Sequence, residues 1–188
     1  LDKNSLVLGI GCQRCHGPAA AHVNFHTENP GKQTAGHITA NKTLNRQQQL
    51  DQCAVCHSGN DKRKIQSRFM FRPGDLLANY FLPAVVADST RHFDVHGNQF
   101  NLLKQSRCFL KSNSITCSTC HNPHGNAAMP AAVYAQKCMG CHQEGSSDFC
   151  TVKNIAVAEL KANCTDCHMP LTPKGSHRLL NGFSFLMY

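Results

Sequence analysis

The 188-residue chain has no tryptophan, and aromatic residues make up only 7% of it. Its hydrophobic fraction is 41%, even with the cysteines counted. A domain of this length normally buries more large apolar side chains than this composition offers. The interior of the protein therefore needs material other than its own side chains.

Long apolar runs are also missing. The longest, at residues 80–87, is interrupted by Pro83 and is far too short to cross a bilayer. This excludes a transmembrane helix in that segment. The first four residues, Leu-Asp-Lys-Asn, do not open a signal peptide, so we expect a mature chain or a piece cut from a longer one.

Cysteine and histidine are abundant instead, with 12 residues of each. Ten of the cysteines lie in the pattern C-x-x-C-H, which occurs five times, whereas chance predicts about 0.05 occurrences at these frequencies. The cysteine pairs are Cys12 and Cys15, Cys53 and Cys56, Cys117 and Cys120, Cys138 and Cys141, and Cys164 and Cys167. The histidines that follow them are His16, His57, His121, His142 and His168.

This pattern is the attachment site of haem c. The two thiols add across the vinyl groups of one porphyrin, and the adjacent histidine places an imidazole on the iron. A redox dithiol normally occurs once, in a βαβ context, and a zinc knuckle needs no histidine directly after each cysteine pair. We therefore expect five covalent haems c, with the motif histidines as proximal ligands.

The spacing of the motifs predicts the architecture. Their first cysteines are separated by 41, 64, 21 and 26 residues, so there is no repeat period. Each porphyrin can replace many apolar side chains, and five attachment points restrict the unfolded chain. We predict one pentahaem domain over residues 1–188, mainly α with extensive coil, cored by haem and with little or no β-sheet.

Short helices are expected where caps and apolar spacing agree. They cover residues 18–27, residues 43–54 with Thr43 as the cap, residues 98–109, residues 131–142, and residues 151–160 with Thr151 as the cap.

The sixth ligand of each iron decides what the iron can do, because it is a histidine, a methionine, a substrate or an open position. Seven histidines lie outside the motifs. The distal candidates are His22, His26, His96, His124 and His177, which leaves His37 and His92 over. The ordinary alternative for each is a solvated or hydrogen-bonded side chain. Five irons in need of ligands favour ligation, and we expect the methionines to pack.

The chain resembles the multihaem cytochrome c superfamily, which includes the tetrahaem cytochrome of ammonia oxidisers and the pentahaem nitrite reductases. The resemblance is strongest to the multihaem C-terminal regions of bacterial proteins, and it covers nearly the whole chain. It rests on C-Q-R-C-H-G-P-A-A-A-H (12–22), R-P-G-D-L-L (72–77), H-G-N-Q-F-N-L-L-K-Q-S-R-C (96–108), I-T-C-S-T-C-H-N-P-H-G (115–125) and C-T-D-C-H-M-P (164–170).

This resemblance implies that His22, His124 and His177 are distal ligands. It also implies a periplasmic or extracellular location, and a further C-x-x-C-H motif upstream in many relatives. No enzymatic activity is inherited from it. The nitrite reductases use a C-x-x-C-K haem, which this chain lacks, and neither Tyr80, Tyr134 nor Tyr188 has the context of the cross-linked tyrosine of hydroxylamine-oxidising relatives.

Three functional hypotheses follow. The first is an electron carrier that passes single electrons between redox proteins or other cytochromes through mostly bis-histidine haems. The second is a reductase or oxidase of small nitrogen or sulfur oxyanions at one open haem. The third is a subunit of an extracellular cytochrome filament or other homo-oligomer.

Two cysteines, Cys108 and Cys150, lie outside the motifs. Because the number of cysteines left over is even, an oxidising compartment suggests one disulfide between them. The alternatives are two buried thiols or an intermolecular bridge.

The formal charge of +8 does not indicate a nucleic-acid partner. Five haems add about ten propionates and roughly +1 per ferric centre, which brings the oxidised protein to about +3 and the reduced one to about −2. No interleaving of aromatic and basic residues suggests base stacking. Arginines suited to pair with the propionates are Arg46, Arg63, Arg68, Arg72, Arg91 and Arg107.

Overall fold

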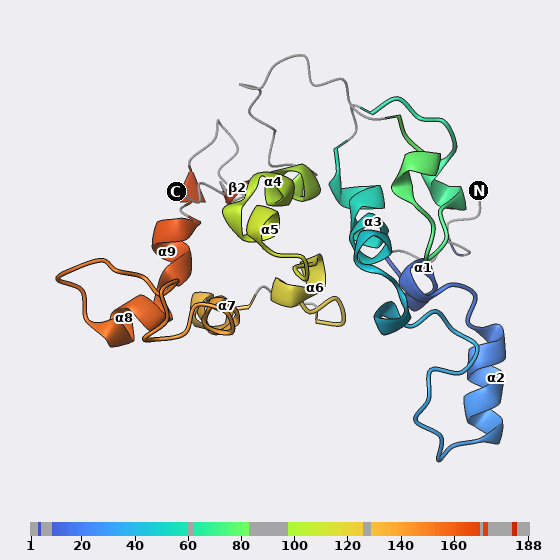
Figure 1. Ribbon diagram of the computed structural model, residues 1–188. Helices are drawn as coiled ribbons and strands as arrows, with labels where there is room; N and C mark the ends of the chain where they lie inside the picture. Colours follow the sequence, from blue (N-terminus) through green and yellow to red (C-terminus); the bar gives the residue numbers. More distant parts are fainter. Residues whose placement is uncertain are drawn as a thin grey trace. The chain divides into compact units, whose positions relative to one another are not determined.

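The computed structural model of the protein describes residues 4, 9–59, 62–82, 98–125, 129–169, 171–172 and 182–183. Short helices joined by long coil dominate this part of the chain (Figure 1). The α-helices are α1 (Cys12–His16), α2 (Ala20–Glu28), α3 (Arg46–His57), α4 (Gln99–Gln105), α5 (Arg107–Lys111), α6 (Cys117–Cys120), α7 (Ala131–Met139), α8 (Val157–Ala162) and α9 (Cys164–His168).

Single 3₁₀ turns are η2 (Asn41–Thr43), η3 (Arg68–Met70) and η4 (Leu77–Asn79). The strands β1 (Leu171–Thr172) and β2 (Gly182–Phe183) pair antiparallel, with Leu171 opposite Phe183. This content confirms the prediction of a mainly α chain with little β-sheet. In the described residues, no helix is long and apolar enough to cross a bilayer.

The chain divides into two compact units. The first comprises Leu1–Val55 and Asp61–Val85, and the second comprises Cys56–Asn60 and Val86–Tyr188. The single-domain organisation expected from the sequence stays a prediction.

The first unit has a small side-chain core between α3 and the segment that follows it. The buried apolar residues here are Leu50, Ala54, Val55, Phe71, Leu77, Tyr80 and Phe81. A buried carboxylate, Asp51, joins the two parts. Its Oδ1 accepts a hydrogen bond from Gln47 Nε2 at 2.7 Å, and its Oδ2 accepts one from the Leu77 backbone N–H at 3.0 Å. Asp51 thereby fastens η4 to α3.

The R-P-G-D sequence forms the turn that returns the chain to α3. The Asp75 N–H donates to the Arg72 carbonyl at 2.9 Å, and Gly74 has a φ of +95°, as the third position of a type II turn requires. Gln48 on α3 donates to the Gly74 carbonyl at 2.7 Å. The Tyr80 hydroxyl donates to Asp75, and this hydrogen bond, together with burial, raises the pKa of Tyr80. The R-P-G-D part of the resemblance is thus the sequence that builds this turn.

Three of the expected helices differ from the prediction, two at their start and one by a break. Asn45, not Thr43, caps α3: its Oδ1 accepts from the Gln48 N–H, and Gln48 Oε1 accepts from the Asn45 N–H. The helix expected over residues 98–109 is broken at Ser106, whose extended backbone and hydroxyl cap α5. Thr151 caps nothing, because α8 begins only at Val157. Helices after Pro18 and Pro130 are confirmed, with the second ending at Met139.

The second unit has almost no side-chain core. In its described residues only two apolar side chains, Phe100 and Ala135, are buried. Its helices still contact one another: α7 packs against α6, α8 and α9, as the yellow-to-red part of Figure 1 shows. Large apolar side chains stay open, such as Leu110 at 67% and Val152 at 53% exposure. The polypeptide of this unit leaves apolar surface for something else to cover.

Replacing Asp51 with leucine should destabilise the holoprotein by about 2 kcal/mol, because it leaves the Leu77 N–H buried without an acceptor. Chemical denaturation followed by far-UV circular dichroism measures the change. Asp148→Ala is the matched control, since that side chain is exposed, and it should be neutral. Equal unfolding midpoints for Asp51→Leu and the wild type would contradict this role.

Candidate haem-binding site

None of the ten motif cysteines is in a disulfide, and they lie on or beside helices. Helices α1, α3, α6 and α9 carry four motifs, and α7 runs into the fourth, Cys138 to His142. Residues three and four apart share one face of a helix, so the spacing C-x-x-C-H turns both thiols and the imidazole to the same side. This arrangement is what attachment of one porphyrin requires.

Hydrogen bonds hold several motif imidazoles in one tautomer. His16 Nδ1 lies 2.8 Å from the Thr39 carbonyl, and His142 Nδ1 lies 2.6 Å from the Asp148 carbonyl. A carbonyl oxygen only accepts, so Nδ1 must carry the proton and Nε2 keeps the lone pair that binds iron. His57 Nδ1 similarly lies 3.2 Å from Gln99 Oε1.

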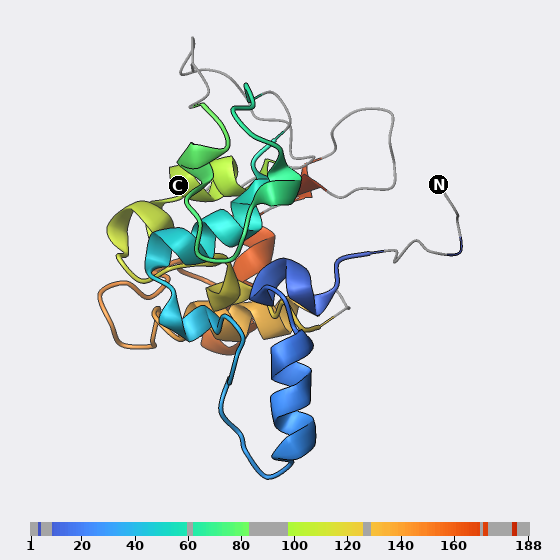
Figure 2. The same cartoon turned by 90° about the vertical axis from the view of Figure 1, so that its right-hand side faces the viewer.

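Of the distal candidates on α2, His22 is oriented in the same way and His26 is not. His22 Nδ1 lies 2.7 Å from the Gly36 carbonyl, which leaves its Nε2 for a metal. In His26, the nitrogen in contact with a carbonyl is Nε2, which lies 3.0 Å from the Thr34 carbonyl oxygen. Both carbonyls come from the loop that runs back along α2 (Figure 2). The geometry favours His22 over His26.

His124 is presented by a tight turn directly after the third motif. Asn122 Oδ1 accepts from the His124 N–H at 3.1 Å, and the Gly125 N–H closes the turn on the Asn122 carbonyl. His37 lies with its ring centroid 5.3 Å from that of Phe25. The remaining candidates His96 and His177, with His92, fall outside the described residues.

Thiols and imidazoles of different motifs gather in the second unit. Burial lowers the pKa of His121, and the neighbouring His57 adds to the shift. Burial raises the pKa of the Cys138 thiol to about 11, and the nearby thiols of Cys164 and Cys120 add to it. His121 is thus held toward the neutral form that ligates iron.

The predicted disulfide between Cys108 and Cys150 is wrong, because the structure places neither cysteine in a disulfide. Burial and the nearby thiol of Cys141 raise the pKa of Cys108 on α5, and burial and the nearby Cys150 raise the pKa of Cys164. Each of the two cysteines thus lies near a motif.

Gly17 ends the first motif with a backbone that other residues rarely adopt. Its φ is +81° and its ψ is −171°, a region that is essentially restricted to glycine. In this conformation the Gly17 N–H still donates to the Gln13 carbonyl, while the chain turns toward α2. The glycine of C-H-G-P thus sets how the chain leaves His16.

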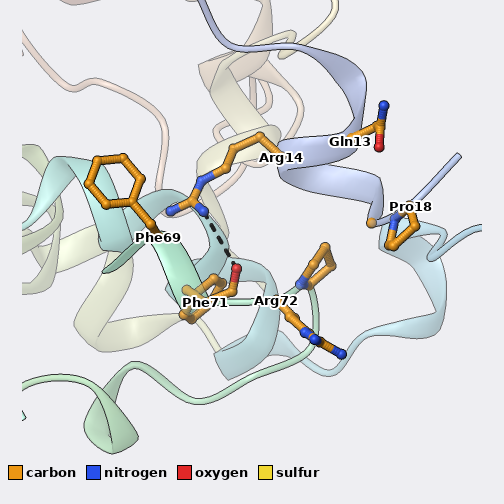
Figure 3. Close-up of a pocket in the computed structure, with 8 residues that line it drawn as sticks. Gln13, Arg14, Pro18, Phe69, Phe71 and Arg72 are labelled. Atoms are coloured by element: carbon orange, nitrogen blue, oxygen red, sulfur yellow. Dashed lines mark hydrogen bonds between the residues drawn. The ribbon is translucent and has the colours of Figure 1, made fainter. Parts of the chain in front are cut away.

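A hollow of about 280 Å³ lies on the other face of α1 (Figure 3). It is lined by Gln13, Arg14, Gly17, Pro18, Phe69, Phe71, Arg72 and Pro73. None of the first motif's thiols or its imidazole lines it, as expected from 100° per residue along the helix. Arg14 spans it by donating to the Arg68 carbonyl at 2.8 Å and to the Phe71 carbonyl at 3.5 Å.

Arg14 therefore clamps residues 68–71 to the first motif. Sequence reasoning missed this residue because it stands inside C-x-x-C-H, where the intervening positions look interchangeable. Arg72, predicted to pair with a propionate, is exposed at the hollow.

The residues present fit haem c. A covalent porphyrin needs thiols that are not in disulfides, imidazoles whose Nε2 can bind iron, and a unit with little side-chain core. Over the described ranges, no three His, Cys, Asp or Glu side chains converge as a metal-ion site.

Comparison with known proteins agrees with this chemistry. The family described as Doubled CXXCH motif matches residues 111–147, which contain the third and fourth motifs. The multiheme cytochrome MtrA of Shewanella baltica (strain OS185) is 27% identical over 159 residues, covering 76% of this chain and 45% of that protein. The chain thus spans less than half the length of that relative. No solved structure matches this chain.

Replacing Gly17 with alanine should destabilise the protein by about 1–3 kcal/mol, because a Cβ is strained at this φ and ψ. We also expect less haem on the peptide that contains Cys12 and Cys15, measured by mass spectrometry after proteolysis. Gly11→Ala, at the other end of α1, is the control: its φ is −80° and nothing lies within 4 Å of the added carbon. Full haem loading and unchanged stability of Gly17→Ala would refute the argument.

Proposed function

We propose that the chain is a multihaem c-type cytochrome that carries five haems, one at each motif, and passes single electrons between redox proteins. Bound haem supplies reversible one-electron chemistry at its iron. The number five rests on the five C-x-x-C-H motifs. The second unit supports haems at motifs 3 to 5, because these motifs share only two buried apolar side chains among the described residues. Porphyrins at all of these motifs would complete that core.

Neighbouring motifs along the chain are also neighbours in space, which supports transfer along the series. In the first unit, Gln52 beside motif 2 hydrogen-bonds to Cys15 of motif 1. In the second unit, His57 of motif 2 acts electrostatically on His121 of motif 3. Helix α7, which leads into motif 4, packs against α6 of motif 3 and α9 of motif 5.

We assign His22 and His124 as distal ligands, supported by the Nε2 of His22 and by the turn that presents His124. His96 and His177 complete the proposal on the sequence pattern alone. His26 leaves the proposed set, since its Nε2 is hydrogen-bonded. The fifth distal ligand then comes from His37 or His92, the two histidines that remain.

A periplasmic or extracellular location belongs to the same proposal. Covalent haem attachment takes place outside the cytoplasm, and the chain carries ten motif cysteines that must stay available as thiols until then. Redox proteins in that compartment would be its partners.

Low-temperature electron paramagnetic resonance of the oxidised protein tests the carrier function. We expect low-spin ferric signals that integrate to the total iron, with no change on adding cyanide or nitrite, because every sixth position is filled. A high-spin signal that shifts with either anion would instead indicate an open haem and a reductase or oxidase.

Ligand assignment on α2 is tested by paired variants. His22→Ala should convert one low-spin haem to high spin, because it removes the imidazole whose Nε2 is available. His26→Ala should leave the spin states unchanged, since its Nε2 only bonds a carbonyl. Magnetic circular dichroism in the near infrared reports both. The opposite pattern would exchange the two assignments.

A further inference from the structure

The side chain of Gln52 connects two motifs that are far apart in sequence. Gln52 directly precedes Cys53, the first anchor of motif 2. Its Nε2 donates to the backbone carbonyl of Cys15, the second anchor of motif 1, at 2.6 Å across 37 residues. Both residues belong to the first unit. One hydrogen bond thus links the residue before the first anchor of motif 2 to the backbone of the second anchor of motif 1.

Gln52 is a costly choice if it serves stability alone. Its Oε1 is buried and has no hydrogen-bond partner among the described residues. An orphaned buried acceptor costs at least as much as a single neutral hydrogen bond returns. Leucine, an apolar side chain that is one atom shorter, would occupy most of this space without the orphan. The amide therefore contributes something other than net folding free energy.

We propose that Gln52 is a positioning residue that holds the haems of motifs 1 and 2 as one rigid electron-transfer pair. This rests on the proposed function, since it requires haems at both motifs. The step is the passage of one electron from the reduced iron of one haem to the oxidised iron of the other. No bond forms or breaks and no proton moves.

Along the backbone, 37 residues separate Cys15 from Gln52. Through the hydrogen bond, the route is the carbonyl of Cys15, the amide of Gln52 and the next residue, Cys53. Fixing this contact fixes how far apart the two thioether-bearing backbones lie. Small displacements of reacting partners are known to change rates strongly.

Gln52→Leu in the holoprotein is the first test. Electron exchange between the two haems should become about tenfold slower, because their separation is no longer fixed. Exchange spectra of haem-methyl protons in the partly reduced protein measure this, with the signals assigned by contacts to His16 and His57. The midpoint of thermal unfolding should stay unchanged.

Gln48→Leu is the matched control. Gln48 lies one turn earlier on α3 and donates to the Gly74 carbonyl at 2.7 Å, a bond of the same type that touches neither motif. Its loss should leave the exchange rate as in the wild type. An equal slowing in this variant would overturn the proposal in favour of a general effect of loosening α3.

Gln52→Glu separates the hydrogen bond from the shape of the side chain. Its carboxylate cannot donate to the Cys15 carbonyl, so exchange should be slow at neutral pH. Protonation restores an O–H donor, so the rate should recover on acidification, while the rate of Gln52→Leu should not. Electron paramagnetic resonance of the spin coupling between the two haems should follow the same pattern.

Unchanged exchange in Gln52→Leu, or no recovery of Gln52→Glu in acid, would refute the positioning role. The haem content of each motif, determined by peptide mass in the wild type, keeps this separate from the proposed function. Absence of haem from motif 1 or motif 2 there would refute the five-haem proposal itself.

Discussion

Burial of covalently attached porphyrin is the constraint on which the rest of this structure depends. In the described residues of the second unit, three motifs stand among helices with only Phe100 and Ala135 buried. Helices of four to nine residues are too short to be stable alone and need tertiary packing. Flat macrocycles fixed through two thioethers each can supply that packing, and they also carry the electrons. The same porphyrins would thus both pack this unit and pass the electrons.

Hydrogen bonds that the imidazoles donate to backbone carbonyls orient them for iron. One loop, residues 34–39, provides the Thr39 carbonyl to His16 and the Gly36 carbonyl to His22. Each bond holds Nδ1 protonated and so directs Nε2 outward. Because these acceptors are backbone atoms, the side chains at their positions take no part in the bonds. Gly36 is still constrained, since a Cβ there would lie 3.0 Å from the Phe25 ring. The conformation of the loop orients both imidazoles, and Gly17 sets how the chain passes from α1 to α2.

Local signals in the sequence predicted the motifs, the haem chemistry and the mainly α fold, because C-x-x-C-H places all its reactive groups within five residues. Helix α7 was also predicted from local signals, namely Pro130 and the alanines after it. Features that depend on distant partners were missed: the Gln52 bond spans 37 residues, and the Arg14 bonds span 54 and 57. The Cys108–Cys150 disulfide was wrong because counting cysteines says nothing of their neighbours. Ligation by His96 and His177 stays a prediction.

The account is tested most directly by the mass of the intact protein under denaturing conditions, where only covalently bound groups remain attached. A red, folded sample should weigh as much as the 20.7 kDa polypeptide plus five haem groups. Its pyridine haemochrome spectrum should show the same number, with both vinyl groups of every porphyrin saturated. A well-folded sample without colour, at the mass of the bare polypeptide, would contradict the account.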